Sequence, residues 1–167
     1  HTRSDRDWSS DVCSSDLKAN ARQPVTFCEG LLEWRSLSRL AAELDIISVH
    51  SYPYHMGTAL ADALGVNRQH YDEARALYPD KQVIFTEMGW SSDSETQIDA
   101  EGNAVKLKPQ ATPENQRAYD EAVAEWLERE NIIGFIFEAF DELWKGDSPI
   151  ASECNFGLYN ESRRKKW

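Results

Sequence analysis

Four short apolar segments constrain the fold of this chain more than any other feature of its sequence. They lie at residues 23–28, 45–50, 82–86 and 132–140, and β-branched and aromatic residues are common in them. Segments of this kind are typical of strands, and strands that are apolar on both faces are typical of a parallel sheet covered by helices. We therefore expect four parallel strands.

Amphipathic stretches follow these segments and complete an alternating pattern. Residues 31–44 place apolar side chains at helical spacing, and residues 58–78 are also typical of a helix, with an interruption at Gly65. The apolar residues of the first stretch are Leu32, Leu37, Leu40, Ala41 and Leu44. The alternation predicts an α/β fold with four β/α units in one domain over residues 18–167.

The third helix has a clear beginning. Thr112 is a capping residue, and Pro113 occupies the first helical position, where its missing N–H is tolerated. Its inward stripe comprises Tyr119, Ala122, Val123, Trp126 and Leu127. The polar stretch before this helix, residues 93–111, is expected at the rim of the fold, with a hairpin tip at residues 100–103.

Composition excludes two classes of partner. The chain has 167 residues, 41% of them hydrophobic, and 18 basic against 29 acidic side chains give a formal net charge of −11. That sign repels nucleic-acid backbones, so we expect no nucleic-acid partner. No apolar run approaches the roughly 18 residues that a membrane-spanning helix needs, so we expect no membrane-spanning segment.

The sequence indicates neither a cofactor nor a metal ion. No glycine-rich phosphate loop follows the first strand, and no helix carries His-Glu-x-x-His spacing. The three cysteines, Cys13, Cys28 and Cys154, lie too far apart for a metal site. We interpret Cys28 and Cys154 as small buried hydrophobic residues.

Residues 1–17 do not fit the pattern of the rest of the chain. They contain the tripeptide Ser-Ser-Asp twice and show neither a helical nor a strand period. The string also resembles a translated sequencing adapter, so we interpret it as a foreign segment, with native sequence from Lys18. A disordered native tail is the alternative.

In folds with parallel strands covered by helices, functional side chains lie at the carboxyl ends of the strands. The first three segments end in Glu29, then His50 with Tyr52 and Tyr54, then Glu87 with Trp90. The fourth ends in Glu138, Asp141, Glu142, Trp144 and Lys145. Sugar rings stack on aromatic faces, and glycosidic cleavage uses two carboxyl groups. This mixture therefore indicates a saccharide substrate.

Each of these features also has a purely structural interpretation. Glu87 follows an apolar strand and would then bind loop amides. Glu138, Asp141 and Glu142 would form the outer face of an amphipathic helix, and His50 would be a hydrogen-bonded core histidine. Pattern alone leaves these alternatives open.

Four segments carry a more specific signal in their order and spacing. The first two are Pro-Val-Thr at 24–26 and the segment 45–54, which ends in Tyr-Pro-Tyr. The third is Phe-Thr-Glu-Met-Gly-Trp-Ser-Ser at 85–92. The fourth begins with Phe-Glu-Ala-Phe-Asp-Glu-Leu-Trp-Lys at 137–145 and extends to Phe-Gly-Leu-Tyr at 156–159. Together they resemble glycoside hydrolase family 17, the retaining β-1,3-glucan hydrolases and transferases. The resemblance covers residues 23–167 and implies a (β/α)8 TIM barrel, with only the last four β/α units present here.

The resemblance also implies roles for individual residues. Glu87 falls on the nucleophile, at the end of the seventh barrel strand. Glu142, Lys145 and Glu153 fall on rim positions after the eighth strand, where they would orient Glu87 and hold sugar hydroxyls.

Aromatic residues of the same segments are implied in substrate binding. Tyr52 and Tyr54 would line the cleft, and Trp144 would contact the sugar beside Lys145. Trp90 is either a sugar platform or a loop packing residue. Ser91, Leu143 and Asn155 depart from the family pattern.

A retaining glycosidase needs a second carboxyl group about 5–5.5 Å from the nucleophile. The family supplies this acid/base from a segment after the fourth strand, and no such segment is found here. Glu29 is the nearest candidate, although its family position is that of a substrate-binding or supporting residue. We therefore expect an inactive or nearly inactive part of a secreted, periplasmic or cell-surface β-1,3-glucan hydrolase that is monomeric as a full-length parent.

Three other functions remain open at this stage. The first is transglycosylation, in which a second sugar intercepts the glycosyl-enzyme. The second is a non-catalytic glucan-binding module, which the aromatic residues and the missing acid/base favour. The third is a retaining glycosidase of the same barrel clan that acts on another β-glycan.

Overall fold

The computed structural model describes residues 16–167, which form two compact units. One unit comprises residues 16–50 and 69–86, and the other comprises residues 51–68 and 87–167. Within the first unit, residues 16–20 are helical. The segment 1–17, interpreted above as foreign, lies almost wholly outside the described residues, so that interpretation stays a prediction.

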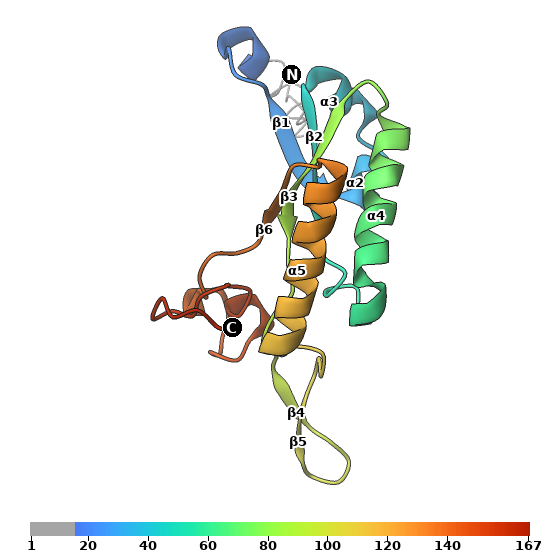
Figure 1. Ribbon diagram of the computed structural model, residues 1–167. Helices are drawn as coiled ribbons and strands as arrows, with labels where there is room; N and C mark the ends of the chain where they lie inside the picture. The colour runs from blue at the N-terminus through green and yellow to red at the C-terminus, as the bar shows by residue number, and fades with distance from the viewer. Residues whose placement is uncertain (1–15) are drawn as a thin grey trace, which may run out of the picture. The chain divides into compact units, whose positions relative to one another are not determined.

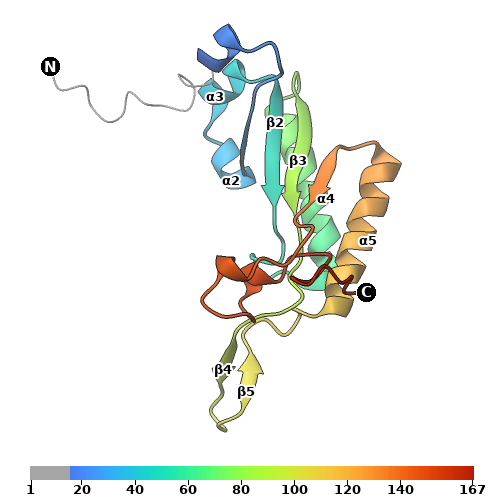
Figure 2. The same ribbon diagram turned by 90° about the vertical axis from the view of Figure 1, so that its left-hand side faces the viewer.

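The first unit contains parallel strands. β1 (Thr26–Gly30) and β2 (Ile46–Ser51) pair in parallel, with Thr26 opposite Ile46 and Gly30 opposite His50. β3 (Gln82–Met88) begins in the same unit and points the same way as β2 (Figure 2). Strands were predicted in all three places, and the structure confirms them, with β1 starting at Thr26 rather than residue 23.

The helix expected over residues 31–44 is instead two short helices, α2 (Leu31–Trp34) and α3 (Ser38–Glu43). The reason lies at Trp34, which is fully buried and donates its indole N–H to the Ser48 carbonyl at 3.0 Å. Its own carbonyl accepts bonds from the Leu37 amide and the Tyr78 hydroxyl. A continuous helix would need that carbonyl for the Ser38 amide, and the helix therefore breaks there.

Two further expectations about this unit were wrong. Leu32, assigned to the inward face, is 70% exposed. Cys28, interpreted as a buried residue, is exposed on β1, whereas Cys154 in the second unit is buried as expected.

Helix α4 (Leu60–Leu77) runs without the interruption expected at Gly65. A Cβ at Gly65 would meet no atom within 4 Å, so packing does not require glycine at this position. A glycine in a helix interior costs about 1 kcal/mol relative to alanine, which a helix of this length tolerates.

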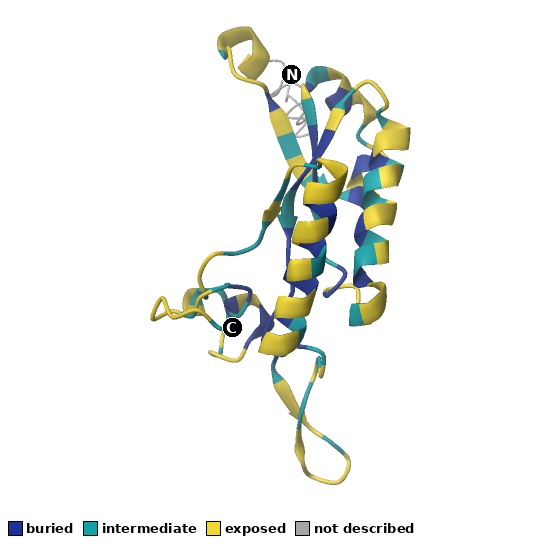
Figure 3. Cartoon of the chain, viewed as in Figure 1, coloured by how far each residue is buried: buried dark blue, intermediate teal, exposed yellow. Residues whose placement is uncertain are grey.

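Helix α5 (Pro113–Glu130) begins as predicted. The Thr112 hydroxyl accepts a hydrogen bond from the Asn115 amide at 3.2 Å, with Pro113 in the first turn. Its buried and exposed faces are distinct in Figure 3. The buried side chains include the predicted Tyr119, Val123, Trp126 and Leu127, together with the polar Gln116 and Asp120. The helix therefore buries an unexpected carboxylate.

The fourth strand is much shorter than predicted. β6 covers Gly134–Ile136 rather than residues 132–140, and it is last in the strand order β1-β2-β3-β6. The Phe137 amide still bonds to the carbonyl of Met88, the last residue of β3, and the chain leaves the sheet at the next residue, where the Glu138 amide bonds to the Phe156 carbonyl. The expectation of a strand covered on both faces is also wrong, since Phe135 is 57% exposed.

The polar insertion contains the expected hairpin. β4 (Thr96–Ile98) and β5 (Ala104–Lys106) pair antiparallel, as Figure 1 shows. The tip is closed by Asp99, whose Oδ1 accepts bonds from the Glu101 and Asn103 amides at 3.0 and 2.7 Å. Among residues 16–167, no helix combines the length and the apolar character that crossing a membrane requires.

Candidate active site

The central contact of the candidate site joins two residues at strand ends. Glu87 lies near the end of β3, and Tyr52 follows β2. The Tyr52 hydroxyl donates a hydrogen bond to Glu87 Oε2 at 2.7 Å. Burial, and then the bond to Glu87, raise the pKa of the Tyr52 phenol above its ordinary value. The phenol therefore keeps its proton and remains a donor that fixes the orientation of the Glu87 carboxylate.

Aromatic rings hold Tyr52 in this position. Its ring packs edge-on against Phe137 at 6.1 Å and against Phe156 at 5.7 Å between centroids. Phe156 is almost fully buried. Tyr52 thus connects the loops that follow β2, β3 and β6 of the second unit.

Two aromatic residues predicted near the substrate are in the interior. Tyr54 and Trp90 have no exposed surface, and their rings pack 5.4 Å apart. The Tyr54 hydroxyl bonds to Ser152 Oγ at 2.8 Å, and the Trp90 indole N–H donates to the Gln110 carbonyl at 3.1 Å. Of the two roles open for Trp90, loop packing describes its position. Tyr54 likewise supports the rim from beneath rather than lining a cleft.

An acidic pair surrounds Lys145 at the end of the segment that follows β6. Lys145 Nζ lies 2.7 Å from Glu138 Oε2 and 2.5 Å from Glu142 Oε2. The side chains of Lys145 and Glu138 are only 17% and 14% exposed. Burial works against the charge on Lys145, but the bonds to both glutamates outweigh it and raise its pKa.

The two glutamates of this cluster differ electrostatically. Burial raises the pKa of Glu138, although Lys145 opposes the shift. The hydrogen bond from Lys145 lowers the pKa of the more exposed Glu142. The amphipathic helix considered as an alternative for this segment is absent, since only a single turn at Leu143–Lys145 is helical. The sequence placed Glu138 at the end of the fourth strand but gave it no role in the site, although its place within an apolar run was a usable signal.

The residues predicted farther along the rim are at the surface. Glu153 Oε1 lies 3.5 Å from His55 Nε2, and Trp144 is 77% exposed. Burial lowers the pKa of His55, and Glu153 opposes that shift. The His55 ring packs 5.1 Å from Tyr52 and 5.4 Å from Phe156. Sequence reasoning missed His55, which lies one residue beyond the Tyr-Pro-Tyr segment.

Two glycines allow the rim segments to approach closely. A Cβ at Gly89 would lie 2.3 Å from the Phe137 carbonyl oxygen, and one at Gly157 would lie 2.1 Å from the Asp141 amide nitrogen. Both distances are far below van der Waals contact. The glycines of the Glu-Met-Gly-Trp and Phe-Gly-Leu-Tyr segments are therefore required by packing between backbones.

A buried ion pair lies beneath these loops. Lys166 Nζ contacts Asp141 Oδ1 at 2.6 Å, and their side chains are 9% and 5% exposed. The same ammonium donates to Ser92 Oγ at 2.7 Å and to the Asn155 carbonyl at 3.1 Å. Burial lowers the pKa of Lys166, and the bond to Asp141 partly restores it. One lysine thereby ties together three segments of the rim.

Asp120 on α5 is a second buried acid near this pair. Neither of its carboxylate oxygens makes a hydrogen bond within the described part of the chain. Burial raises its pKa to about 8, against the opposing charge of Lys166. Asp120 therefore holds its proton to a higher pH than an ordinary aspartate does.

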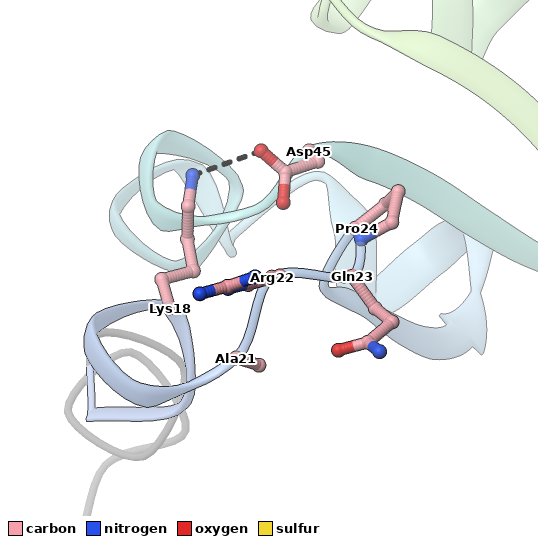
Figure 4. A pocket seen from close by; sticks show the side chains of 6 residues that line it. All are labelled: Lys18, Ala21, Arg22, Gln23, Pro24 and Asp45. Atoms are coloured by element: carbon pink, nitrogen blue, oxygen red, sulfur yellow. Dashed lines mark hydrogen bonds and ion pairs between the residues drawn. The ribbon is translucent and has the colours of Figure 1, made fainter.

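The first unit holds Glu29 and His50 at strand ends. Glu29 Oε1 accepts a bond from the Gly30 amide at 2.9 Å, and His50 lies opposite Gly30 in the β1–β2 register. A hollow of about 300 Å³ near Lys18 and Asp45 (Figure 4) contains their 3.0 Å ion pair and none of the predicted site residues. Within residues 16–167, no cluster of three or more His, Cys, Asp or Glu side chains is arranged to hold a metal ion.

Comparison with known proteins supports a glycoside hydrolase. A model of the BtgE/BtgC glycoside hydrolase domain matches residues 9–157. The cell surface mannoprotein MP65 of Candida albicans is 30% identical over 118 residues, which are 70% of this chain and 28% of that protein.

The fold of the chain is similar to those of several solved structures. An active-site mutant of the Rhizomucor miehei β-1,3-glucanosyltransferase, in complex with laminaritriose, superposes with a TM-score of 0.79 at 21% identity, over 93% of this chain and 54% of that one. A glycoside hydrolase family 17 β-1,3-glucanosyltransferase structure from the same organism gives 0.75 at 22% identity, over 93% and 53%. An endo-laminarinase from Formosa Hel1_33_131 gives 0.71 at 21%, over 90% and 47%. The chain thus spans about half of these structures and shares their α/β fold with a parallel sheet.

Proposed function

The chain belongs to the BtgE/BtgC glycoside hydrolase domain family, and from that premise we propose that it is part of a retaining enzyme acting on β-1,3-glucan. The main support for this proposal is the hydrogen bond between Tyr52 and Glu87 at the end of β3. A carboxylate held in one orientation by a permanent donor is suited to attack on an anomeric carbon. The known relatives of this fold that act on β-1,3-glucan support the choice of substrate.

Glu87 has the role of nucleophile in this proposal. One of its oxygens forms a bond to the anomeric carbon while the bond from that carbon to the leaving oxygen breaks. A second carboxyl group, about 5–5.5 Å away, protonates the leaving oxygen and later removes a proton from the attacking water. We propose that this acid/base comes from the upstream half of a (β/α)8 barrel, of which the chain is the last four units.

The remaining predicted residues have binding roles in this proposal. Lys145 keeps Glu142 and Glu138 in fixed positions and places a positive charge at the rim. Carboxylates and an exposed tryptophan suit a polyhydroxylated ring with apolar faces. The residues to which we assign sugar contacts are Glu142, Trp144, Lys145 and Glu153, with Glu29 as a more distant subsite residue.

Hydrolysis is tested by completing the barrel. The chain is joined to the first four units of the Rhizomucor miehei enzyme and incubated with laminarin, and new reducing ends and their anomeric form are followed by NMR. We expect the products to keep the β configuration. Glu87→Gln should lower turnover by about 10³-fold or more, because the nucleophile is lost.

A matched variant controls for the loss of a carboxylate. Glu114→Gln changes an exposed acid in the first turn of α5 and should leave turnover unchanged. Undiminished turnover by the Glu87→Gln protein would contradict the assignment of Glu87. Laminarin binding that survives Glu87→Gln without any turnover by the completed barrel would favour the glucan-binding module instead.

Transglycosylation is the second candidate, because two of the similar structures are glucanosyltransferases. Product analysis at increasing acceptor concentration separates it from hydrolysis, since transfer yields longer oligosaccharides at the expense of water-derived ends. The similarity to a cell surface mannoprotein supports a location outside the cell for the parent protein.

A further inference from the structure

A second hollow of about 420 Å³ lies at the loop that follows β6. Its lining includes Phe140, Glu142, Trp144, Glu161 and Arg163. This volume lies within the range of small-molecule pockets, which begin near 300 Å³. All of these residues belong to the second unit.

Aromatic surface is unusually accessible here. Trp144 is 77% exposed and Phe140 is 44% exposed. The Phe140 ring packs against Tyr159 with centroids 5.6 Å apart, so Tyr159 supports it from one side. Exposed aromatic rings are surfaces on which the C–H faces of pyranose rings stack.

Charged groups of both signs surround these rings. Glu142 and Glu161 supply acceptors, and the Arg163 guanidinium lies 5.9 Å from the centroid of the Phe140 ring. A carboxylate binds hydroxyl donors, and a guanidinium offers five donors to hydroxyl oxygens. A neutral polyol can bind to both kinds of group, whereas an anion would be repelled by the carboxylates and a cation by the guanidinium.

Hydrogen bonds within the turn at residues 160–164 fix the backbone of Arg163. The Asn160 carbonyl accepts a bond from the Arg163 amide at 2.8 Å, and the Asn160 side chain accepts one from the Arg164 amide at 2.9 Å. Arg163 has a φ of 60°, a left-handed conformation that residues other than glycine and asparagine rarely adopt.

The hollow shares one residue with the candidate active site, since Glu142 lines the hollow and also contacts Lys145. We propose that it is an additional saccharide subsite, which holds a glucosyl unit of a β-1,3-glucan chain beyond those bound around Glu87. Phe140 and Trp144 provide the stacking surfaces, and Arg163 and Glu161 bind hydroxyl groups. This proposal rests on the proposed function for its choice of glycan.

The test uses binding by the chain itself. Isotope-labelled protein is titrated with laminaritriose and with laminarihexaose, and the indole N–H signal of Trp144 is followed by NMR after assignment with Trp144→Phe. We expect laminarihexaose to bind more tightly than laminaritriose and to shift the Trp144 signal. Arg163→Asn should weaken laminarihexaose binding roughly 3- to 10-fold and abolish the gain over laminaritriose.

Two features of the experiment separate the effect of the Arg163 side chain from the effects of the backbone turn and of net charge. Asparagine tolerates the left-handed conformation, so Arg163→Asn keeps the turn. Arg164→Asn removes the same charge from the neighbouring exposed position, which does not line the hollow, and should bind like the parent chain.

The outcomes separate this proposal from the proposed function. Equal laminarihexaose affinity of the Arg163→Asn and parent chains, with shifts only around Tyr52, overturns the subsite and leaves the enzyme proposal standing. Loss of affinity in Arg163→Asn supports the subsite even if Glu87→Gln keeps turnover in the completed barrel. A dimer in sedimentation that Arg163→Glu converts to monomer would mean that a second copy of the chain occupies the hollow, and would also overturn the subsite.

Discussion

Tyr52 is the residue whose chemistry is most tightly linked to Glu87. Its hydroxyl donates to the carboxylate at 2.7 Å, and its raised pKa keeps it protonated across the working range of any glycosidase. A donor fixed in this way restricts the orientation of the Glu87 carboxylate. Tyr52 is therefore a positioning residue in the proposed reaction.

Tyr52→Phe should slow the glycosylation step of the completed barrel by roughly 10- to 100-fold. A hydrogen bond to a charged group contributes about 1.5–3 kcal/mol, and the phenylalanine ring keeps the packing against Phe137 and Phe156. The measurement is kcat and KM on laminarin, and we expect the loss in kcat.

Tyr119→Phe is the matched control. It removes a buried hydroxyl that bonds to Asn67 at 3.0 Å and should change stability without changing kcat. An equal fall in kcat for both variants would mean that Tyr52 acts through folding and not through Glu87.

At the scale of single residues, the sequence indicated which residues belong to the candidate site. It did not indicate whether each side chain is buried or exposed. Glu87 and Tyr52 were predicted from short segments, because strand ends place such residues at a common rim. Tyr54 and Trp90 come from the same segments but are fully buried. Which aromatic residue of a loop faces inward depends on partners such as Ser152 and Gln110, which lie far away along the chain.

Single elements show what periodicity can and cannot predict. α5 was predicted almost completely, because its cap, its proline and its apolar stripe are local signals. The break between α2 and α3 depends on the Tyr78 hydroxyl, which takes the Trp34 carbonyl from 44 residues away. β6 ends early because the Glu138 amide bonds to the Phe156 carbonyl instead of to the sheet. These hydrogen-bond partners lie far away along the chain, so the sequence near each element does not reveal them.

The C-terminal segment is the element that we expect to be most sensitive to one substitution. Lys166→Met removes the ammonium that binds Asp141, Ser92 and Asn155, and leaves the Asp141 carboxylate buried without its counter-ion. Breaking a buried pair in this way costs about 3–5 kcal/mol. Urea unfolding should show this loss of stability.

Lys165→Met controls for the change in charge, since Lys165 is exposed and should lose less than about 0.5 kcal/mol. The double variant Asp141→Asn with Lys166→Met should be more stable than Lys166→Met alone, because no charge is then left buried. A double variant as unstable as the sum of the two single variants would contradict the pairing.

For the whole molecule, Asp120 makes stability depend on pH. Its pKa is about 8 in the folded chain and about 3.9 in an unfolded one. Between these values the folded state holds a proton that the unfolded state has lost. Asp120 therefore contributes stability that is complete below about pH 4 and is lost as the pH rises through about 8.

Asp120→Asn should remove this dependence, because the amide does not titrate. We expect the free energy of unfolding of the variant, relative to the parent chain, to rise by about 2–4 kcal/mol between pH 5 and pH 8. Chemical denaturation at a series of pH values measures it. Asp72→Asn, on the exposed side of α4, should show no such trend, and a parallel trend in both variants would refute the role of Asp120.

The hairpin of β4 and β5 has a consequence for how chains of this family can vary. Its tip is closed by Asp99 with the amides of Glu101 and Asn103, and its base is tied by Lys106 to Asp93 at 2.7 Å. The tip can therefore be lengthened, shortened or replaced by an inserted module without reaching the contacts below it. Residues 100–103 are the place where we expect natural length variation to accumulate and where a reporter can be grafted with least harm.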